Sequence, residues 1–499
     1  MKQRREPPLI DLHVDASQSI PLHLQLYGQL RQAILRGAFK PGTRLQSTRQ
    51  LASELKVSRN TVASAYEQLL AEGYIAGRIG SGTYVSSAIP DELLFTHTKD
   101  LPERGRDLSL RGKLLVDTIL NISLRPAAFR PFSHGVPALA EFPFEEWQQL
   151  ALRRWHDPTH DVLDYGSPAG HRGLRESIAE YLISARAVKC EPDQIIIVSG
   201  AQQGIDVVCR LLIDTGDPVW MEDPGYLAAR AAFASAGAQV IPVPVDEEGI
   251  DVAEGEKLSA TARLVYVTPS HQYPIGVTMS LTRRLALLEW ASRSGAWIIE
   301  DDYDSDYRYS GRPLPALQGL DAEGRVIYIG TFSKVLLPAL RLGYVVVPRD
   351  LVSSFLAARD VLSRSSQSMD QAILSDFMRS GQFTRHIRRM RQLYAKRQSV
   401  LLQAANSELG DLLEIRPEHS GIHLVGWLPP KIADTQVSVE AHKEGVESQP
   451  LSAYSMRKLK RGGLVLGYAA FSENEIRVAI QKLGVVLKRM NFSGIRKAR

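Results

Sequence analysis

Apolar side chains spaced three or four residues apart first appear between Pro21 and Gly37, and they predict a helix that Gly37 ends. They are Leu22, Leu26, Leu30 and Ile34. A short helix capped by Ser47 or Thr48 is predicted next, followed by a longer one capped by Ser58. The first seventy residues therefore form a small helical cluster.

Two helices joined by a tight turn are typical of a helix-turn-helix unit, whose second helix enters the major groove of DNA. The first turn after Ser58 exposes Arg59, Asn60 and Thr61, which suit phosphates and base edges. Residues 74–85, YIAGRIGSGTYV, follow as two β-prone arms around a glycine-rich centre. This pattern predicts a hairpin wing beside the helices.

From about residue 130 short apolar runs alternate with helical stretches. The runs are 194–200, 219–223, 263–269, 297–302 and 325–330. Continuously apolar strands between helices predict a mostly parallel sheet that is covered on both faces. From about residue 385 a long basic helix and two strand-like runs predict a smaller α+β part.

The length of 499 residues exceeds that of one compact core, so we expect several domains. Polar, proline-containing sequence with little periodicity predicts a linker, with a short helix near 114–124. The predicted organisation is a winged helix-turn-helix domain over 1–86, a linker over 87–130, and a body over 131–490 with a large part at 131–384 and a small part at 385–490.

Composition narrows the class of protein further. An apolar share of 44% and a charged share of 23% are ordinary for a soluble globular protein. Cys190 and Cys209 lack metal-ligand or disulfide spacing, which fits a reducing cytosol and predicts no metal site. The first residues lack the apolar core of a signal peptide, and no apolar run is long enough to span a bilayer. We expect a cytoplasmic protein without membrane association.

Positive charge is concentrated at the beginning of the chain. Residues 1–86 hold eleven Lys and Arg against six Asp and Glu, a net charge of +5 that equals that of the whole chain. A basic head on a neutral body suggests phosphate contacts, although charge alone fits a solvated surface equally well. The helical pattern of the head favours contact with DNA over a merely solvated surface.

Lys334 is the candidate reactive residue of the body. In TFSKVLLPALRLGY, 331–344, the lysine follows a small hydroxyl residue at the end of an apolar run, and Arg341 follows it. An amine for a Schiff base, with hydroxyls and a guanidinium for a phosphate, is what an enzyme uses to hold pyridoxal phosphate. Asp301 and Tyr303 follow another apolar run, where a carboxylate could keep a pyridine nitrogen protonated and a phenol could bond the 3′-oxygen.

Each of these signals is weak by itself. SGAQQG, 199–204, could hold a phosphate at a helix start, but any tight strand-to-helix turn uses Gly and Ser. Tyr226 in EDPGY could stack on a flat ring or pack within its loop. An acidic strand end is more often a cap or a surface turn. The order and spacing of the segments give the stronger indication.

Residues 20–86 resemble the winged helix-turn-helix of the GntR family of bacterial transcription regulators. The resemblance lies in QSTRQLASELKVSRNTVASAYEQLLAEGYIAGRIGSGTYV. It implies double-stranded operator DNA as a partner. The DNA contacts that it implies are Arg49, Ser58, Arg59, Asn60, Thr61, Arg78 and Gly80.

The order of the motifs from about residue 132 to 490 resembles the fold-type-I aminotransferases. This resemblance implies an α/β PLP-dependent transferase fold with a smaller α+β C-terminal subdomain and pyridoxal 5′-phosphate as cofactor. It implies an internal aldimine at Lys334, pairing of Asp301 with the pyridine nitrogen, and a contact of Tyr303 with the 3′-oxygen. Tyr226 would stack on the ring. The phosphate ligands would be Ala201, Gln202, Thr331, Ser333 and Arg341.

Tyr165, in LDYGSPAGHRGLRE, is similar to a tyrosine that such proteins lend to the phosphate site of the neighbouring subunit. A head-to-tail homodimer of the aminotransferase type is therefore implied.

Two positions depart from catalytic aminotransferases. Tyr273 in HQYPIG stands where many of them have an asparagine that touches the cofactor. Leu464 and Val465 stand where enzymes of the aspartate type have an arginine for the substrate carboxylate, so that Arg461 or Arg477 would have to replace it. Because turnover needs the lysine and the substrate clamp together, these departures favour a sensor.

A GntR head joined to such a body resembles the MocR/GabR-type subfamily of regulators. The resemblance implies a PLP-dependent, DNA-binding transcription regulator that senses a small amine, an amino acid or a B6 vitamer through the aldimine at Lys334. An active aminotransferase with a DNA-binding autoregulatory head is the alternative. A purely structural body with an empty cofactor pocket is a third interpretation.

Overall fold

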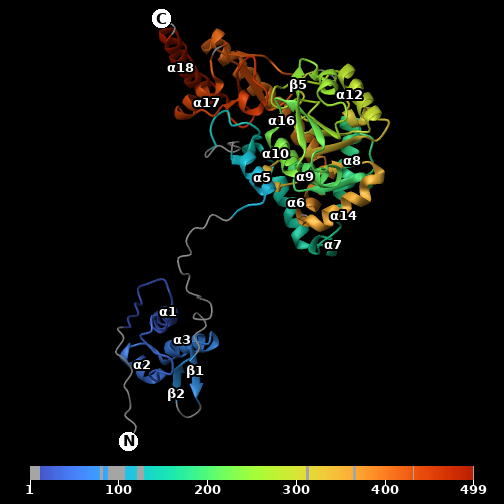
Figure 1. The fold of residues 1–499 in the computed structure, drawn as a ribbon. Helices are drawn as coiled ribbons and strands as arrows, with labels where there is room; N and C mark the ends of the chain where they lie inside the picture. The colour runs from blue at the N-terminus through green and yellow to red at the C-terminus, as the bar shows by residue number, and fades with distance from the viewer. Residues whose placement is uncertain are drawn as a thin grey trace. The chain divides into compact units, whose positions relative to one another are not determined.

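The computed structural model describes residues 12–78, 82–87, 107–120, 129–310, 314–363, 367–430 and 432–497. They belong to two compact units, which divide between Asp107 and Leu108 (Figure 1). In these segments, the helices are all too short or too polar to cross a membrane.

The described residues of the first unit form three helices and a two-stranded hairpin (Figure 1). These elements are α1 (Leu22–Leu35), α2 (Thr48–Glu54), α3 (Arg59–Ala71), β1 (Ile75–Arg78) and β2 (Gly82–Val85). The hairpin strands pair antiparallel, as expected of a wing. The arrangement is the winged helix-turn-helix that the sequence predicts.

Hydroxyl caps define where two of these helices begin. The Ser47 Oγ accepts a hydrogen bond from the Gln50 amide at 3.2 Å, so Ser47 is the cap of α2. The Ser58 Oγ accepts from the Thr61 amide at 3.1 Å and caps α3. Such caps satisfy amides that have no partner inside the helix. The helices then pack through fully buried residues, among them Leu26, Leu30, Val62, Ala65 and Leu69.

An eight-stranded sheet forms the centre of the second unit, with the order β3-β10-β9-β8-β7-β4-β5-β6 (Figure 1). Its strands are β3 (Ile195–Val198), β4 (Pro218–Asp223), β5 (Gln239–Asp246), β6 (Gly249–Ile250), β7 (Leu264–Val267), β8 (Trp297–Asp302), β9 (Val326–Thr331) and β10 (Gly343–Val346). The five central strands from β9 to β5 run parallel.

The two ends of this sheet are antiparallel, which the sequence did not predict. β10 runs antiparallel to both β9 and β3, and β6 runs antiparallel to β5. An antiparallel return needs no crossover helix, so the short segment 332–342 suffices to join β9 to β10. That segment contains Lys334.

Alternate residues of the strands face two different cores. On β3, Ile196 and Val198 pack in a core with α9 (Ala201–Leu212), whereas Ile195 and Ile197 pack on the opposite face. Because helices cover both faces, both faces of a strand such as β3, IIIV, are apolar. The other helices of the large part are α6 (Phe144–His156), α7 (His160–Leu163), α8 (Arg172–Arg186), α10 (Leu227–Ala236), α11 (Val252–Leu258), α12 (Leu281–Ser294), α13 (Leu317–Leu320), α14 (Val352–Ser363) and α15 (Ser368–Arg379).

The small part is built on an antiparallel sheet with the order β11-β12-β14-β13. Its elements are α16 (Gln382–Glu408), β11 (Glu414–Ile415), β12 (His423–Trp427), α17 (Asp434–Lys443), β13 (Gln449–Pro450), β14 (Gly463–Gly467) and α18 (Glu473–Lys497). Phe132 forms a bridge with Gly467, so the beginning of the body also joins the small sheet.

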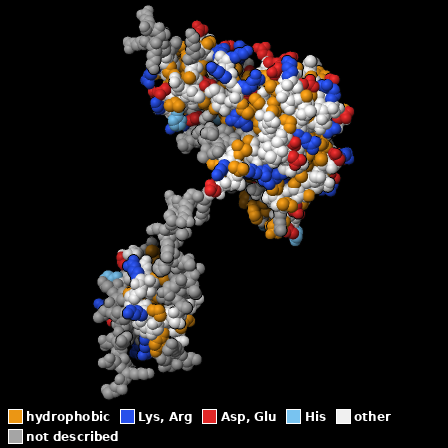
Figure 2. Space-filling view, viewed as in Figure 1, with side chains coloured by type: hydrophobic (Ala, Val, Ile, Leu, Met, Phe, Trp, Pro, Cys, Tyr) orange, Lys and Arg blue, Asp and Glu red, His pale blue; other side chains and the backbone are white. Residues whose placement is uncertain are grey.

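Helix α5 (Leu110–Leu120) lies inside the predicted linker. It packs against α10 and belongs to the second unit. On the visible face of that unit, acidic and basic side chains lie interspersed, in keeping with its nearly balanced charge (Figure 2).

Candidate functional site

A cavity of about 1130 Å³ opens where the ends of β8 and β9 meet the start of α9 and the small part. Nine of the ten predicted cofactor residues line it: Ala201, Gln202, Tyr226, Asp301, Tyr303, Thr331, Ser333, Lys334 and Arg341. The parallel topology brings these strand ends to one edge of the sheet, which is the usual place for a ligand in such folds.

Lys334 reaches into this cavity from the connection between β9 and β10. Its Nζ donates a hydrogen bond to the Gly135 carbonyl oxygen at 2.7 Å. Burial lowers the pKa of the Lys334 amine, and the carboxylates of Asp304 and Asp301 oppose that shift. A lowered pKa leaves more of the amine uncharged and able to act as a nucleophile.

Asp301 lies near the end of β8 and is 4% exposed. Its Oδ2 accepts a hydrogen bond from the Tyr266 hydroxyl at 2.6 Å, while its Oδ1 is buried without a partner among the described residues. Burial raises the pKa of this carboxyl to about 7. A protonated pyridine nitrogen would supply both a donor for Oδ1 and a positive charge for the carboxylate, so this residue fits the cofactor ring.

A phosphate cradle lies at the start of α9. Gly200 precedes the helix with φ 98°, and the Arg341 guanidinium lies 3.9 Å from the position that a Gly200 Cβ would occupy. Helix amides together with a guanidinium form an anion site. Nearby, the Thr331 Oγ1 accepts a hydrogen bond from the Ser333 amide at 3.2 Å. These groups fit the phosphate of the predicted cofactor.

Tyr273, at the predicted asparagine position, belongs to a chain of aromatic side chains in the cavity wall. Its ring meets that of Tyr226 edge-on, with centroids 5.7 Å apart. Its hydroxyl donates to that of Tyr454 at 3.3 Å, and the Tyr454 hydroxyl lies 3.1 Å from His134 Nε2. Uncharged phenols and an imidazole thus form this wall.

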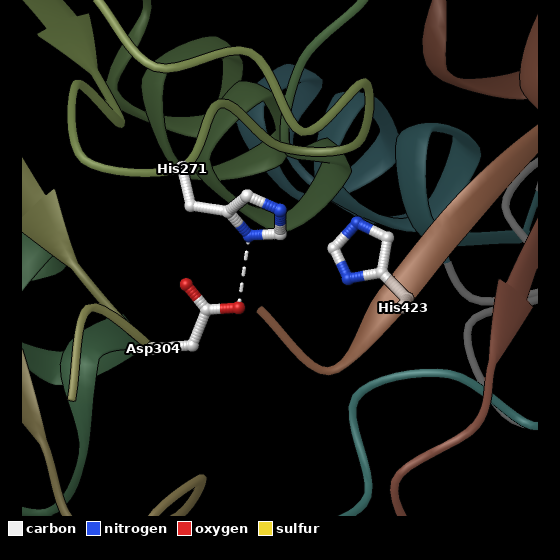
Figure 3. A group of neighbouring side chains, drawn as sticks. All are labelled: His271, Asp304 and His423. Carbon is white, nitrogen blue, oxygen red and sulfur yellow. Dashed lines mark hydrogen bonds and ion pairs between the residues drawn. The ribbon is translucent and has the colours of Figure 1, made fainter. Parts of the chain in front are cut away.

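His271 and Asp304 lie next to each other, and the sequence did not suggest either residue (Figure 3). The His271 Nδ1 lies 3.0 Å from Asp304 Oδ2 and 2.9 Å from the Tyr303 hydroxyl. Burial opposes a charge on His271, but Asp304 raises its pKa, with Glu418 contributing. A histidine in a loop gives no sequence signal of such a pairing, because its partner lies thirty-three residues away.

His423, on β12, brings a second imidazole next to His271 (Figure 3). Its Nε2 bonds the Pro274 carbonyl oxygen at 3.0 Å. Within the described part of the chain, His271, Asp304 and His423 could hold a metal ion, since their donor atoms lie within 4.8 Å of one another. The bond between His271 Nδ1 and Asp304 Oδ2 leaves His271 Nε2, Asp304 Oδ1 and His423 Nδ1 buried without a partner among the described residues. The absence of a metal stays a prediction.

The two arginines considered as replacements for the carboxylate clamp lie outside the cavity lining. The Arg461 Nε donates to the Leu428 carbonyl oxygen at 2.6 Å, and its Nη1 pairs with Glu414 at 2.5 Å. Arg477 lies on α18 and pairs with Glu473 at 3.4 Å. Neither arginine lines the cavity of its own chain, and both bond other partners.

Tyr165 is 67% exposed and lies outside the cavity lining of its own chain. It is placed in the loop before α8, on the surface of the second unit. Its assignment to a neighbouring subunit stays a prediction.

In the first unit, Arg49, Arg59 and Asn60 are exposed at the starts of α2 and α3. The Ser58 and Thr61 hydroxyls lie 2.8 Å apart within the cap of α3. These two side chains therefore stabilise the helix start in addition to any contact with DNA. The backbone of Arg78 ends β1, whereas its side chain and all of Gly80 lie outside the described residues.

Two family descriptions match separate parts of the chain. Residues 22–85 match bacterial regulatory proteins of the gntR family, and residues 131–483 match aminotransferase class I and II. The chain is 40% identical to the probable rhizopine catabolism regulatory protein MocR of Rhizobium meliloti, with 97% of each chain covered. It is 33% identical to the pyridoxine biosynthesis transcriptional regulator PdxR of Corynebacterium glutamicum, with 93% of this chain and 95% of that one covered.

Among solved structures, the kynurenine aminotransferase of Pyrococcus horikoshii in complex with PMP is similar with a TM-score of 0.68 and 29% identity. The match covers 80% of this chain and 98% of that one. The large mixed sheet and the small antiparallel part therefore form the fold-type-I transferase fold, whose cofactor is pyridoxal phosphate.

Proposed function

This chain belongs to the MocR-type transcription regulators, in which a DNA-binding GntR head precedes an aminotransferase class I and II body, and we propose that the body senses a small amine. The sensed molecule is an amine, an amino acid or a B6 vitamer that reaches Lys334. Regulation of transcription is the function of this family. Our proposal is that the effector binds in the cavity of the body.

One observation supports the cofactor part of this proposal. Asp301 Oδ1, which has no partner among the described residues, and the Gly200–Arg341 cradle lie at one cavity. When bound, pyridoxal phosphate supplies an aldehyde carbon that primary amines can join. In this assignment Lys334 holds the cofactor, Asp301 keeps its ring nitrogen protonated, and Tyr303 faces its 3′-oxygen. Tyr226 lies against the ring.

The phosphate then belongs to the residues at the start of α9 and after β9. They are Ala201, Gln202, Thr331, Ser333 and Arg341. The neighbouring subunit's copy of Tyr165 completes this site in a head-to-tail homodimer. The DNA contacts that we assign to the head are Arg49, Ser58, Arg59, Asn60, Thr61, Arg78 and Gly80.

Apolar residues stand where enzymes of the aspartate type have the arginine that binds the substrate carboxylate, and this replacement favours sensing over turnover. Val465 lies in an apolar cluster with Val425, Leu451 and Tyr454 instead of presenting a charge. Turnover needs a substrate held in a fixed orientation while a proton moves, and binding alone does not. The alternative, an active aminotransferase with an autoregulatory head, is favoured by the complete set of Lys334, Asp301 and Tyr303.

Steady-state product formation separates the two functions. The cofactor-loaded chain is incubated with a panel of amino donors and a keto-acid acceptor, and the keto acids formed are measured. For a sensor we expect single-turnover amounts at most, together with amine-dependent changes in the DNA footprint. Continuous keto-acid production with an unchanged footprint would establish the aminotransferase instead.

A further inference from the structure

His271 and Asp304 form a buried pair that contacts a residue of the cavity. Each is 1% exposed in the single chain, so a neighbouring subunit cannot add contacts to either side chain. The His271 Nδ1 lies 3.0 Å from Asp304 Oδ2 (Figure 3). The same nitrogen lies 2.9 Å from the hydroxyl oxygen of Tyr303, which lines the cavity. One ring nitrogen is therefore shared by a carboxyl group and a phenol.

The carboxylate determines where the proton of the imidazole lies. An ionised carboxylate only accepts hydrogen bonds, so its contact with Nδ1 requires a proton on Nδ1. In the opposite tautomer the lone pair of Nδ1 would face the lone pairs of Asp304. Burial raises the pKa of Asp304, and the positive charges of His271 and Lys334 oppose that shift. Nδ1 of His271 thus carries a proton whether the ring is neutral or charged.

That proton in turn restricts the Tyr303 hydroxyl. An oxygen next to an N–H accepts from it, so the proton of the Tyr303 hydroxyl points away from His271. Burial raises the pKa of Tyr303 well above its ordinary value, and the hydroxyl keeps its proton. Among the described residues this hydroxyl has no second hydrogen-bond partner. Its proton is therefore available to a ligand in the cavity.

We infer that His271 and Asp304 are positioning residues that orient the Tyr303 hydroxyl as a hydrogen-bond donor to the 3′-oxygen of the cofactor. This inference rests on the proposed function, which places Tyr303 at that oxygen. A donor at the 3′-oxygen stabilises the negative charge there and weakens the hold of the bound cofactor on its titratable proton. The pH midpoint of the cofactor's visible absorption therefore reports on this hydrogen bond.

Other titratable groups near the pair belong to both parts of the body. The carboxyl groups are those of Glu222, Asp301, Asp302 and Glu418, and the remaining groups are Tyr273, Lys334 and His423. Burial lowers the pKa of His423 well below its ordinary value, so this imidazole is neutral at pH 7. All seven groups are retained in the variants proposed below, so comparison with the wild type isolates the contribution of His271.

Loss and restoration of the N–H group test the role of His271. In the cofactor-loaded full chain, His271→Leu should raise the absorption midpoint by roughly 0.5–1 pH unit, because the Tyr303 hydroxyl loses the donor that orients and polarises it. His271→Asn should restore most of the wild-type value, since an amide nitrogen attached to Cγ takes the place of Nδ1. His171→Leu, which removes an imidazole that caps α8 outside the cavity lining, should leave the midpoint unchanged.

Tyr303→Phe separates an effect through the hydroxyl from a structural effect. This variant should itself raise the midpoint by about 1–2 pH units. In the Tyr303→Phe background, His271→Leu should add nothing, because the group through which His271 acts is gone. Equal effects of His271→Leu with and without the Tyr303 hydroxyl would overturn the inference. An unchanged midpoint in His271→Leu, with Tyr303→Phe behaving as expected, would overturn it as well.

Failure of the proposed function has a different result. If Tyr303→Phe leaves the midpoint unchanged, the hydroxyl is not at the 3′-oxygen, and the proposed placement of the cofactor is wrong.

Asp304→Asn provides a second variant in case His271→Leu does not fold, because it keeps the volume of the pair. The amide can donate to Nδ1 and move the ring proton to Nε2, so that Nδ1 competes for the Tyr303 proton. We expect the midpoint to rise, as in His271→Leu. A folded Asp304→Asn variant with the wild-type midpoint would show that Asp304 does not orient the Tyr303 hydroxyl through His271.

Discussion

At the scale of the residue, the proposed role of Asp301 predicts that cofactor binding depends on pH. Its Oδ2 is taken by Tyr266, and its Oδ1 has no protein partner in the described structure. Burial raises its pKa to about 7, so in the cofactor-free chain it is charged above that pH and protonated below it. The charged form is the one that pairs with a protonated ring nitrogen.

We therefore expect the cofactor affinity of the wild type to fall as pH drops through about 7. Asp301→Asn should weaken cofactor binding by about tenfold to a hundredfold at pH 8 and should lose this pH dependence, since a hydrogen bond to a charged group contributes roughly 1.5–3 kcal/mol. Fluorescence titration with pyridoxal phosphate at several pH values measures both effects.

Glu222 provides a matched control for this experiment. It is buried outside the cavity lining, burial also raises its pKa to about 7, and it accepts a hydrogen bond from the hydroxyl of Thr268, which does line the cavity. Glu222→Gln should leave the pH dependence of cofactor binding as it is. If the dependence disappeared in that variant and persisted in Asp301→Asn, the carboxylate would have been assigned to the wrong residue.

The sequence could predict the residues at strand ends, because a polar residue directly after an apolar run is a local signal. Lys334 and Asp301 were found in this way. His271, Asp304 and Tyr454 were not, because their roles depend on contacts between distant segments: Tyr273 and Tyr454 lie 181 residues apart in the chain. Local pattern contains no information on such a pair.

At the scale of elements, the sequence predicted the parallel strands at the centre of the sheet but not the antiparallel pairing at its two edges. β5 contains Pro242 and Pro244, which cannot donate to a ladder and so hide the strand in the sequence. The structure tolerates them because the far side of β5 pairs only at its end, with the two residues of β6. β10 was not predicted because it has only four residues and directly follows the segment with Lys334 and Arg341, so the sequence does not set it apart as a separate strand.

Helix α3 should read the operator through its exposed first turn. Arg59→Ala should weaken operator binding by about 1–3 kcal/mol if the guanidinium contacts a base edge, and should relax specificity at that position. Arg36→Ala, which removes an exposed arginine at the end of α1, is the control for the loss of one charge. Mobility-shift assays with specific and random DNA distinguish the two variants. Equal losses on both DNAs in both variants would show that Arg59 acts only through its charge.

Helix α16 contains a histidine that should make the body sensitive to acid. His386 is 6% exposed, its Nε2 bonds the Val335 carbonyl oxygen at 3.0 Å, and burial lowers its pKa to about 4. A depressed pKa in the folded state stabilises the protein above the unfolded pKa, and this stability is lost as pH falls toward the folded pKa. The loss from this group amounts to about 2 kcal/mol at pH 5.

His386→Gln keeps a donor for Val335 but does not titrate. We expect the variant to be less stable than the wild type at pH 8 and to approach or exceed it at pH 5, as measured by thermal unfolding. A difference between the two melting temperatures that is the same at both pH values would mean that His386 is charged, or water-exposed, in the folded state.

At the scale of the whole molecule, the head and the body are separate compact units. Regulation therefore requires that a ligand bound in the body changes how the heads bind DNA. An effector changes transcription only if it binds one arrangement of the dimer better than another, because equal affinity shifts no population. The cavity lies between the large and small parts of the body, so a ligand there is able to distinguish two positions of these parts. Two heads in a dimer would then meet two half-sites at a spacing that depends on the body.

Lys334 is the residue at which this coupling is best tested. Lys334→Ala leaves the head unchanged, so we expect it to bind operator DNA with wild-type affinity in the absence of effector. Because the variant has lost the amine that we propose holds the cofactor, its footprint and its transcription should no longer respond to an amine that alters both in the wild type. Lys396→Ala, which removes an exposed lysine of α16, should respond like the wild type. A normal response of Lys334→Ala would show that the signal reaches the DNA without passing through this lysine.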